Sequence, residues 1–136
     1  MNHAHFSIDV LTGKKIIIKL GLSGDVIDAD ELAALKQWAG EVQRRVKEAS
    51  QSINRKVAIL VDLRKLESFS EGETLAILAE LMKADNPYVE KTATFGASKK
   101  IQLAEKITGM LAGRELKSFA TEEMAVAWLN SNVLGR

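Results

Sequence analysis

The stretch "VDLRKLESFSEGETLAIL", residues 61–78, decides the fold class of this chain. It joins the apolar run "KVAILVDL", which starts at Lys56, to a helical pattern that begins near Ser70 and runs to about Lys83. The apolar run is rich in β-branched residues, which is typical of a central strand covered on both faces. The stretch therefore predicts a buried strand, a connecting loop and a helix, the unit from which α/β folds are built.

The sequence before this unit predicts a hairpin and a long helix. "HFSIDV" from His5 alternates apolar and polar residues, and "IIIKLGL" from Ile16 follows a glycine turn, so the two segments predict an antiparallel pair of strands. Through residues 28–50 apolar side chains recur at spacings of three and four, as on one face of a helix. Asp28 and Glu31 have the capping-box spacing that begins such a helix.

The sequence after the unit predicts further alternation of strands and helices. The only proline, Pro87, ends the second helix, and "KTATFGA" from Lys91 predicts a strand. A third helix is predicted from Ser98 to Gly113, a residue suited to the left-handed conformation after a helix. Its expected buried face consists of Ile101, Ala104, Ile107 and Leu111.

Residues 114–119 predict a short strand and residues 121–131 a closing helix. The order is strand, strand, helix and then three strand–helix units, without repeats or an internal linker. We therefore expect one α/β domain over residues 1–136, with a mixed, mostly parallel sheet of about five strands, an N-terminal antiparallel hairpin and about four helices.

The composition excludes several classes of protein. The chain has 19 Lys and Arg against 18 Asp and Glu, and no Cys, so disulfides, thiolate metal sites and cysteine nucleophiles are excluded. No signal-like N-terminus and no long apolar window are present, so we expect a cytoplasmic protein without stable membrane insertion. A basic cluster around the end of the first predicted helix lacks interleaved aromatic residues, so we expect no nucleic-acid binding. That cluster comprises Arg44, Arg45, Lys47, Arg55 and Lys56.

The sequence gives little basis for metal binding or catalysis. His3 and His5 are the only histidines, and they would supply at most two metal ligands near a chain end. No combination of serine, histidine and acid is suggested, and no nucleophile elbow is present. We therefore expect no metal, no cofactor and no enzymatic activity.

The order of elements, the phrase "VDLRKLESFSEGETL" and the ending "SFATEEMAVAWL" resemble the STAS domains, the family of the bacterial anti-sigma factor antagonists, and in particular its SpoIIAA-like branch. The resemblance covers nearly the whole chain. Its C-terminal pattern falls on Phe119, Ala125, Trp128 and Leu129. The resemblance implies a non-catalytic regulatory domain that binds a protein partner, either an anti-sigma-like kinase or another regulator.

The resemblance also implies a switch position. In the antagonists an Asp-Ser pair follows the central strand, and phosphorylation of that serine releases the partner kinase. Here the pair falls on Ser70 and Glu71, so a carboxylate takes the place of the phosphorylatable hydroxyl and the domain would be locked in one state. Ser70 and Glu73 also fit a capping box, which would give Ser70 a purely structural role. Ser68 is a second available hydroxyl.

We expect the functional site at the C-terminal ends of the parallel strands, where open α/β sheets bind ligands. The expected partner-binding or switch loop comprises Asp62, Arg64, Ser68, Ser70 and Glu71. Asp62 itself is expected to hydrogen-bond neighbouring loop amides rather than act as an acid.

A second candidate site at this edge is an anion site at Ser98, Lys99 and Lys100. Positive charge in the first turn of a helix is disfavoured by roughly 0.3–1 kcal/mol per residue, which a bound anion would offset. Two solvated lysines are the alternative explanation.

The second helix carries more apolar side chains than one face of a sheet can cover: Leu75, Ala76, Ile77, Leu78, Ala79, Leu81 and Met82. A ligand, a second subunit or a partner would cover the rest. The SpoIIAA-like branch resembles the lipid-binding CRAL-TRIO domains in fold, so the alternative function is a carrier of a small apolar ligand or lipid. A homodimer is a further alternative. Trp38, beside the apolar stripe of the first helix, would flank the core or extend an exposed patch.

Overall fold

The computed structural model describes residues 3–114 and 116–131. Glu115, which belongs to the predicted strand 114–119, lies outside the described residues. The elements, in chain order, are β1 (His5–Leu11), β2 (Ile17–Val26), α1 (Ala29–Ile53), β3 (Val57–Asp62), β4 (Leu66–Phe69), α2 (Glu71–Asp85), the 3-10 turn η1 (Asn86–Tyr88), β5 (Val89–Phe95), α3 (Lys99–Ala112), β6 (Lys117–Phe119) and α4 (Glu122–Leu129).

The strands form one mixed sheet in the order β1-β2-β3-β5-β6, and β4 pairs with β2 off this path. β1 runs antiparallel to β2, whereas the pairs β2–β3, β3–β5 and β5–β6 are parallel. The predicted α/β fold with an N-terminal antiparallel hairpin and a mostly parallel sheet is confirmed. β3 lies between β2 and β5, as its continuous apolar sequence predicts.

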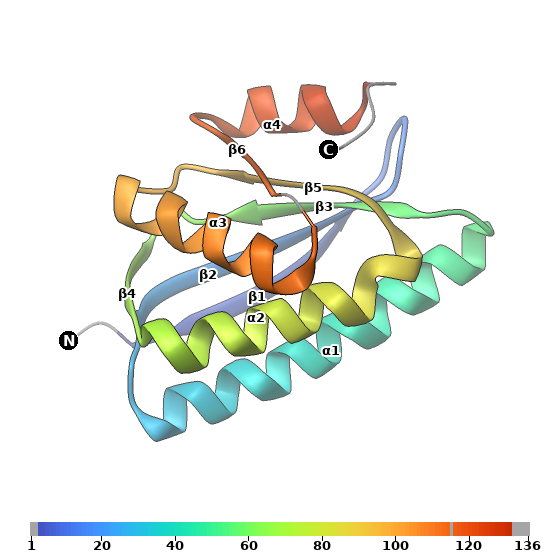
Figure 1. Cartoon of the computed structure of the whole chain (residues 1–136). Helices are drawn as coiled ribbons and strands as arrows, with labels where there is room; N and C mark the ends of the chain where they lie inside the picture. The colour runs from blue at the N-terminus through green and yellow to red at the C-terminus, as the bar shows by residue number, and fades with distance from the viewer. Residues whose placement is uncertain (1–2, 115, 132–136) are drawn as a thin grey trace.

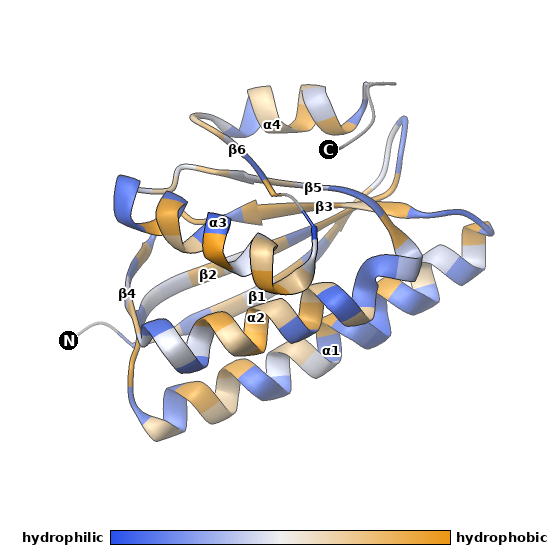
Figure 2. Ribbon diagram, in the orientation of Figure 1, coloured by the Kyte–Doolittle hydropathy of each residue, from blue (hydrophilic) through white to orange (hydrophobic). Residues whose placement is uncertain are grey.

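Helices cover both faces of the sheet: α1, α2 and α3 lie on one face and α4 on the other (Figure 1). The alternation of side chains along β3 divides the core accordingly. Val57 and Ile59 belong to the cluster under α1–α3, whereas Ala58 and Leu60 belong to the cluster under α4. Figure 2 shows the apolar residues of the strands concentrated between these layers.

The long helix α1 begins and packs as its sequence predicts. The Glu31 amide donates to Asp28 Oδ1 at 2.9 Å, and Glu31 Oε1 accepts from the Asp28 amide at 3.2 Å, which completes the capping box. Trp38 is 8% exposed, its ring centroid lies 5.5 Å from that of Phe6, and its Nε1 donates to the Ser7 carbonyl at 3.2 Å. Trp38 is therefore a core residue with a satisfied polar atom.

The loop predicted after β3 contains a strand, β4, so that prediction is wrong. β2 extends to Val26, and its last residues have backbone groups that β4 pairs in parallel. The Gly24 amide donates to the Lys65 carbonyl and the Ser70 amide to the Val26 carbonyl, both at 2.8 Å. Gly24 has φ 80°, and a Cβ there would lie 2.2 Å from the His3 carbonyl oxygen, so only glycine fits this irregular pairing.

Neighbouring helices cover most of the apolar surface of α2. The helix packs against α1 on one side and α3 on the other. Leu75, Ala79 and Leu81 are buried, whereas Leu78 is half-buried and Ala76 is exposed. The apolar surplus predicted from the sequence is therefore reduced by α1 and α3, and Leu78 and Met82 line a cavity described below.

Candidate functional site

The end of β3 carries a closed ion pair. Arg64 donates from Nη2 to Asp62 Oδ2 at 2.7 Å and from Nε to Oδ1 at 3.0 Å, while its backbone amide donates to Oδ1 at 3.1 Å. The loop amide contact predicted for Asp62 is confirmed. These bonds from Arg64 hold the pKa of Asp62 below its usual range. Both carboxylate oxygens are engaged, so Asp62 is poorly placed to accept a proton from a substrate.

Arg64 also contacts the end of β5. Its guanidinium carbon lies 5.1 Å from the centre of the Phe95 ring, and its aliphatic stem lies against Gly96. Gly96 has φ 75°, a conformation that favours glycine. Asp62 and Arg64 therefore belong to a seam between β3 and β5, as their place at the strand ends predicts.

Ser68 lies at a different seam, between β4 and β2. Its hydroxyl donates to Asp25 Oδ1, and both residues are half-buried. A phosphate on Ser68 would be placed against the Asp25 carboxylate, where like-charge repulsion and desolvation oppose it. The contact gives Ser68 a structural role in fixing β4.

Ser70 is the N-cap residue of α2, but its side chain makes no capping hydrogen bond, so the predicted capping box with Glu73 is wrong. Its backbone explains the difference. Ser70 has ψ 113°, and its amide donates to the Val26 carbonyl at the end of the β4 pairing. The N-cap residues that do bond through their side chains have ψ between 157° and 174°; they are Asp28, Ser98 and Thr121.

The first turn of α2 therefore presents a half-buried hydroxyl free of a capping bond beside exposed acids. Glu71 and Glu73 are both exposed, and the N-terminal end of a helix favours negative charge. This helix end combines a hydroxyl, two carboxylates and a backbone fixed by β4.

The predicted anion site at the start of α3 has a different explanation for one of its lysines. Ser98 Oγ accepts from the Ile101 amide at 3.3 Å, so it caps the helix. Lys100 Nζ lies 5.8 Å from the centre of the Phe69 ring, a cation–π contact that joins α3 to β4. Lys99 is exposed. The contact gives Lys100 a partner that is not an anion.

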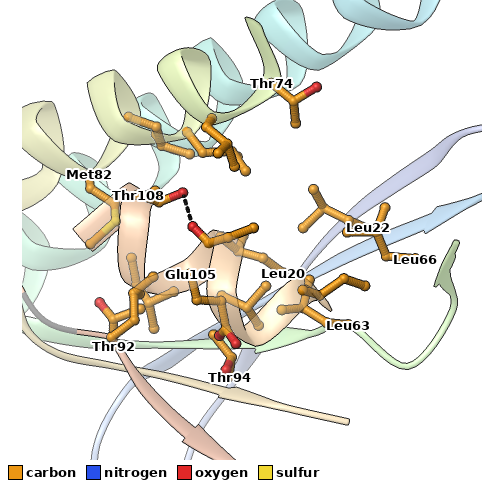
Figure 3. A pocket seen from close by; sticks show the side chains of 18 of the residues that line it. Leu20, Leu22, Leu63, Leu66, Thr74, Met82, Thr92, Thr94, Glu105 and Thr108 are labelled. Atoms are coloured by element: carbon orange, nitrogen blue, oxygen red, sulfur yellow. Dashed lines mark hydrogen bonds between the residues drawn. The ribbon is translucent and has the colours of Figure 1, made fainter. Parts of the chain in front are cut away.

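A cavity of about 100 Å³ lies between α2, α3 and the sheet. Most of its lining is apolar, but the close-up in Figure 3 shows polar side chains among the leucines, with Glu105 directed from α3 towards Thr94 of β5. Some buried polar atoms of the lining have no hydrogen-bond partner among the described residues. They are Thr74 Oγ1, Asp85 Oδ1, Thr94 Oγ1 and both carboxylate oxygens of Glu105.

Burial changes the charge state of both acids in this lining. It raises the pKa of Asp85 to about 7, an effect that the positive charge of Arg114 opposes. Burial also raises the pKa of Glu105, against the smaller opposing effect of the Thr94 and Ser118 hydroxyls. The cavity thus contains acids biased towards their neutral form, which can donate a hydrogen bond as well as accept one.

Sequence reasoning missed these acids because α3 buries a different face from the one predicted. Ile101 and Ala104 are buried as expected, but Ile107 is 42% exposed and Leu111 is 52% exposed. The buried face is completed by Glu105, Thr108, Gly109 and Ala112. Small residues on this face allow α3 to approach its neighbours closely, and that packing outweighs the apolar stripe. The spacing of Ala104, Thr108 and Ala112 was the available signal.

The fold is similar to several solved structures. An uncharacterised protein of the DUF3478 family with a SpoIIAA-like fold from Shewanella loihica PV-4 matches with a TM-score of 0.67 and 15% identity, over 95% of this chain and 97% of that chain. The anti-sigma factor antagonist SpoIIAA in its unphosphorylated form matches with a TM-score of 0.63 and 12% identity, over 93% and 99% of the two chains. An anti-sigma factor antagonist from Mycobacterium paratuberculosis matches with a TM-score of 0.59 and 18% identity, over 93% and 96%.

No curated protein sequence matches the chain. At these identities the structural matches establish the fold alone. The SpoIIAA-like family model matches residues 17–130, which span the strands from β2 to β6 and all four helices, so the chain belongs to the SpoIIAA-like family.

Proposed function

We propose that this protein is a regulatory protein-interaction domain that resembles the anti-sigma factor antagonists. Its partner surface is the segment Arg64–Glu73 together with the N-terminal end of α2. The observation that carries the proposal is the Ser70 hydroxyl, which makes no capping hydrogen bond, beside the exposed carboxylate of Glu71, on a helix end whose backbone β4 holds in place. A fixed backbone reduces the entropy that binding costs.

The charge of Glu71 defines the regulatory state in this proposal. SpoIIAA, a structural relative of this chain, has been solved in an unphosphorylated form and in a phosphorylated form. A permanent carboxylate at the corresponding helix end stands in for part of the charge of a phosphate. The proposed domain is therefore held in one state, and its affinity for the partner does not depend on a kinase.

We propose a non-catalytic role for the same surface. Asp62 is the acid closest to the end of the central strand, and both of its oxygens bond to Arg64. The Ser68 hydroxyl donates a hydrogen bond to Asp25, and neither histidine belongs to this loop. This arrangement supports binding through charge and shape rather than proton transfer.

Site-specific crosslinking in the native cells tests the partner surface. A photoreactive amino acid at Glu71 should give one discrete crosslinked protein, whereas the same group at Glu80, at the far end of α2, should not. The identified protein is then titrated with wild type, Glu71→Gln and the matched control Glu80→Gln. The proposal expects weaker binding for Glu71→Gln alone, and equal binding by both variants would exclude it.

The second candidate function is a carrier of a small apolar ligand, and the cavity under α2 and α3 is the observation that favours it. Its volume of about 100 Å³ is below the roughly 300–1,000 Å³ typical of drug-sized ligand sites. A lipid would therefore require α2 and α3 to separate. A small ligand with an apolar body and one polar group would fit the lining better, since Glu105 and Thr94 can pair with a hydroxyl or an amine.

Native mass spectrometry of protein purified gently from its own cells tests the carrier function. A discrete small-molecule adduct is expected on wild type, and the variant Ala104→Leu, which places a larger side chain in the cavity lining, should lose it. Ala76→Leu adds the same side chain at an exposed position of α2 and should keep the adduct. A bare chain in all three proteins would refute the carrier function and leave the protein-interaction proposal untouched.

A further inference from the structure

The outer face of α3 concentrates the exposed apolar surface of the described molecule. Of its seven exposed large hydrophobic side chains, four belong to this helix: Leu103 at 60%, Ile107 at 42%, Met110 at 81% and Leu111 at 52%. Since each helical residue advances about 100°, these four lie within an arc of about 100° and form one continuous stripe. This apolar stripe is exposed to solvent, whereas the polar residues Glu105 and Thr108 are buried on the opposite face of the helix.

The exposed charges that α3 itself carries have one sign. Lys99, Lys100 and Lys106 are exposed on the same helix. Glu105, the acid within Lys99–Ala112, is 8% exposed and faces the cavity. In Figure 2 the first turn of α3 is hydrophilic and apolar segments follow along the helix. α1 differs, because its exposed Arg44 forms ion pairs with Glu41 and Glu48.

We propose that the outer face of α3 docks on an anionic lipid surface. An apolar stripe with lysines beside it is the arrangement of helices that lie flat in a membrane interface. Leu103, Ile107, Met110 and Leu111 enter the boundary between headgroups and acyl chains, and Lys99 and Lys106 reach the lipid phosphates while their methylene stems stay on the apolar side. Among residues 3–114 and 116–131, no helix has the length and hydropathy to cross a bilayer.

The composition of this face argues against a protein partner or a second copy of the chain. Protein interfaces are enriched in aromatic residues, Met and Arg and depleted in Lys, and Met110 is the one residue of the enriched types in α3. Residues Lys99–Ala112 contain three lysines, no aromatic residue and no Arg. Two copies joined through this face would bring lysines together, and the cost of that contact grows as water is excluded. A lipid surface supplies both negative charge and an apolar phase.

This inference goes beyond the proposed function and does not depend on the surface at α2. It also differs from the cavity ligand, because the docking residues are on the outer face of the helix that lines the cavity. Failure of membrane docking would leave both earlier proposals standing.

Vesicle co-sedimentation tests the inference with the whole chain. The probes are vesicles of phosphatidylcholine alone and vesicles in which phosphatidylglycerol replaces part of it. Wild type should bind the anionic vesicles, with an affinity that falls as salt is added. The double variant Leu103→Gln and Met110→Gln should lose on the order of tenfold in affinity for each side chain. Both positions are more than half exposed, so the variant should fold.

Two further variants separate the contributions. Lys106→Gln should weaken binding to anionic vesicles by about fivefold, which corresponds to roughly 1 kcal/mol for one lysine near the surface. Met124→Gln removes an exposed methionine of α4, on the other face of the sheet, and should bind as wild type does. Circular dichroism establishes that each variant is folded.

Four results would overturn the inference. The first is no binding of wild type to anionic vesicles, and the second is binding that the Leu103→Gln and Met110→Gln variant retains. The third is self-association of wild type that this variant abolishes without any vesicle binding, which would assign the face to a second copy. The fourth is loss of binding to a protein partner in this variant, again without any vesicle binding, which would assign the face to that partner.

Discussion

Asp85 should make the stability of this protein fall as the pH rises. Its carboxyl is 2% exposed, at the end of α2, and burial raises its pKa to about 7. In the unfolded chain an Asp has a pKa of about 3.9. Between about pH 4 and about pH 7 the folded state therefore holds a proton that the unfolded state has released. Stability from this group is complete at low pH and is lost as the pH rises towards 7.

The magnitude follows from the shift. One pKa unit corresponds to about 1.36 kcal/mol, so a shift of about three units corresponds to about 4 kcal/mol in the free energy of unfolding. Asp85→Asn stays neutral at every pH and removes this dependence. The variant should match wild type near pH 4 and exceed it in stability above about pH 7, by up to about 4 kcal/mol.

Urea denaturation at a series of pH values measures the effect. The quantity to compare is the difference in free energy of unfolding between Asp85→Asn and wild type, because other groups that titrate, such as Asp62, cancel in that difference. Glu105 also has a raised pKa, so Glu105→Gln and the double variant show whether the two acids act independently. A difference that does not change with pH would refute the assignment of a neutral buried carboxyl to Asp85.

Five further substitutions, at four positions, test the local structure by denaturation. Asp28→Ala should cost about 1 kcal/mol because it removes a real cap, whereas Ser70→Ala should be nearly neutral, and equal costs would contradict the capping geometry. Ser68→Ala should cost about 1 kcal/mol through its bond to Asp25, and Ser68→Asp should cost more through like charge; a neutral Ser68→Asp would contradict the seam. Gly96→Ala should cost about 1–2 kcal/mol because of its positive φ, and an unchanged midpoint would contradict it.

The sequence predicts the sheet and its helices well because their signals are periodic. The apolar run before Asp62 becomes the central strand, and the alternation from His5 becomes the antiparallel hairpin. β4 escapes prediction because it depends on a tertiary event, the extension of β2 to Val26, where it provides backbone groups for pairing. β4 has four residues, of which Phe69 alone is buried, so its sequence has too little apolar and polar alternation to predict a strand.

The candidate site is predicted in position and less well in detail. Asp62 accepts from the loop amide of Arg64, as expected of an Asp at a strand end, and also from the Arg64 guanidinium. Ser70 has the right spacing for a cap, but its ψ of 113° differs from that of the residues that cap through their side chains, and spacing alone cannot reveal this. The acids of the cavity escape prediction because α3 is apolar on one face and small on the other, and packing selects the small face.

The N-terminal end of α2 is the proposed partner surface, and the charge of Glu71 is proposed to strengthen binding there. The most direct measurement is the affinity of the crosslinked partner for wild type and for Glu71→Gln, by isothermal titration calorimetry. We predict that Glu71→Gln binds the partner at least about fivefold more weakly than wild type, as expected when one interfacial charge worth about 1 kcal/mol is lost. An affinity equal to that of wild type, with Glu80→Gln also unchanged, would contradict it.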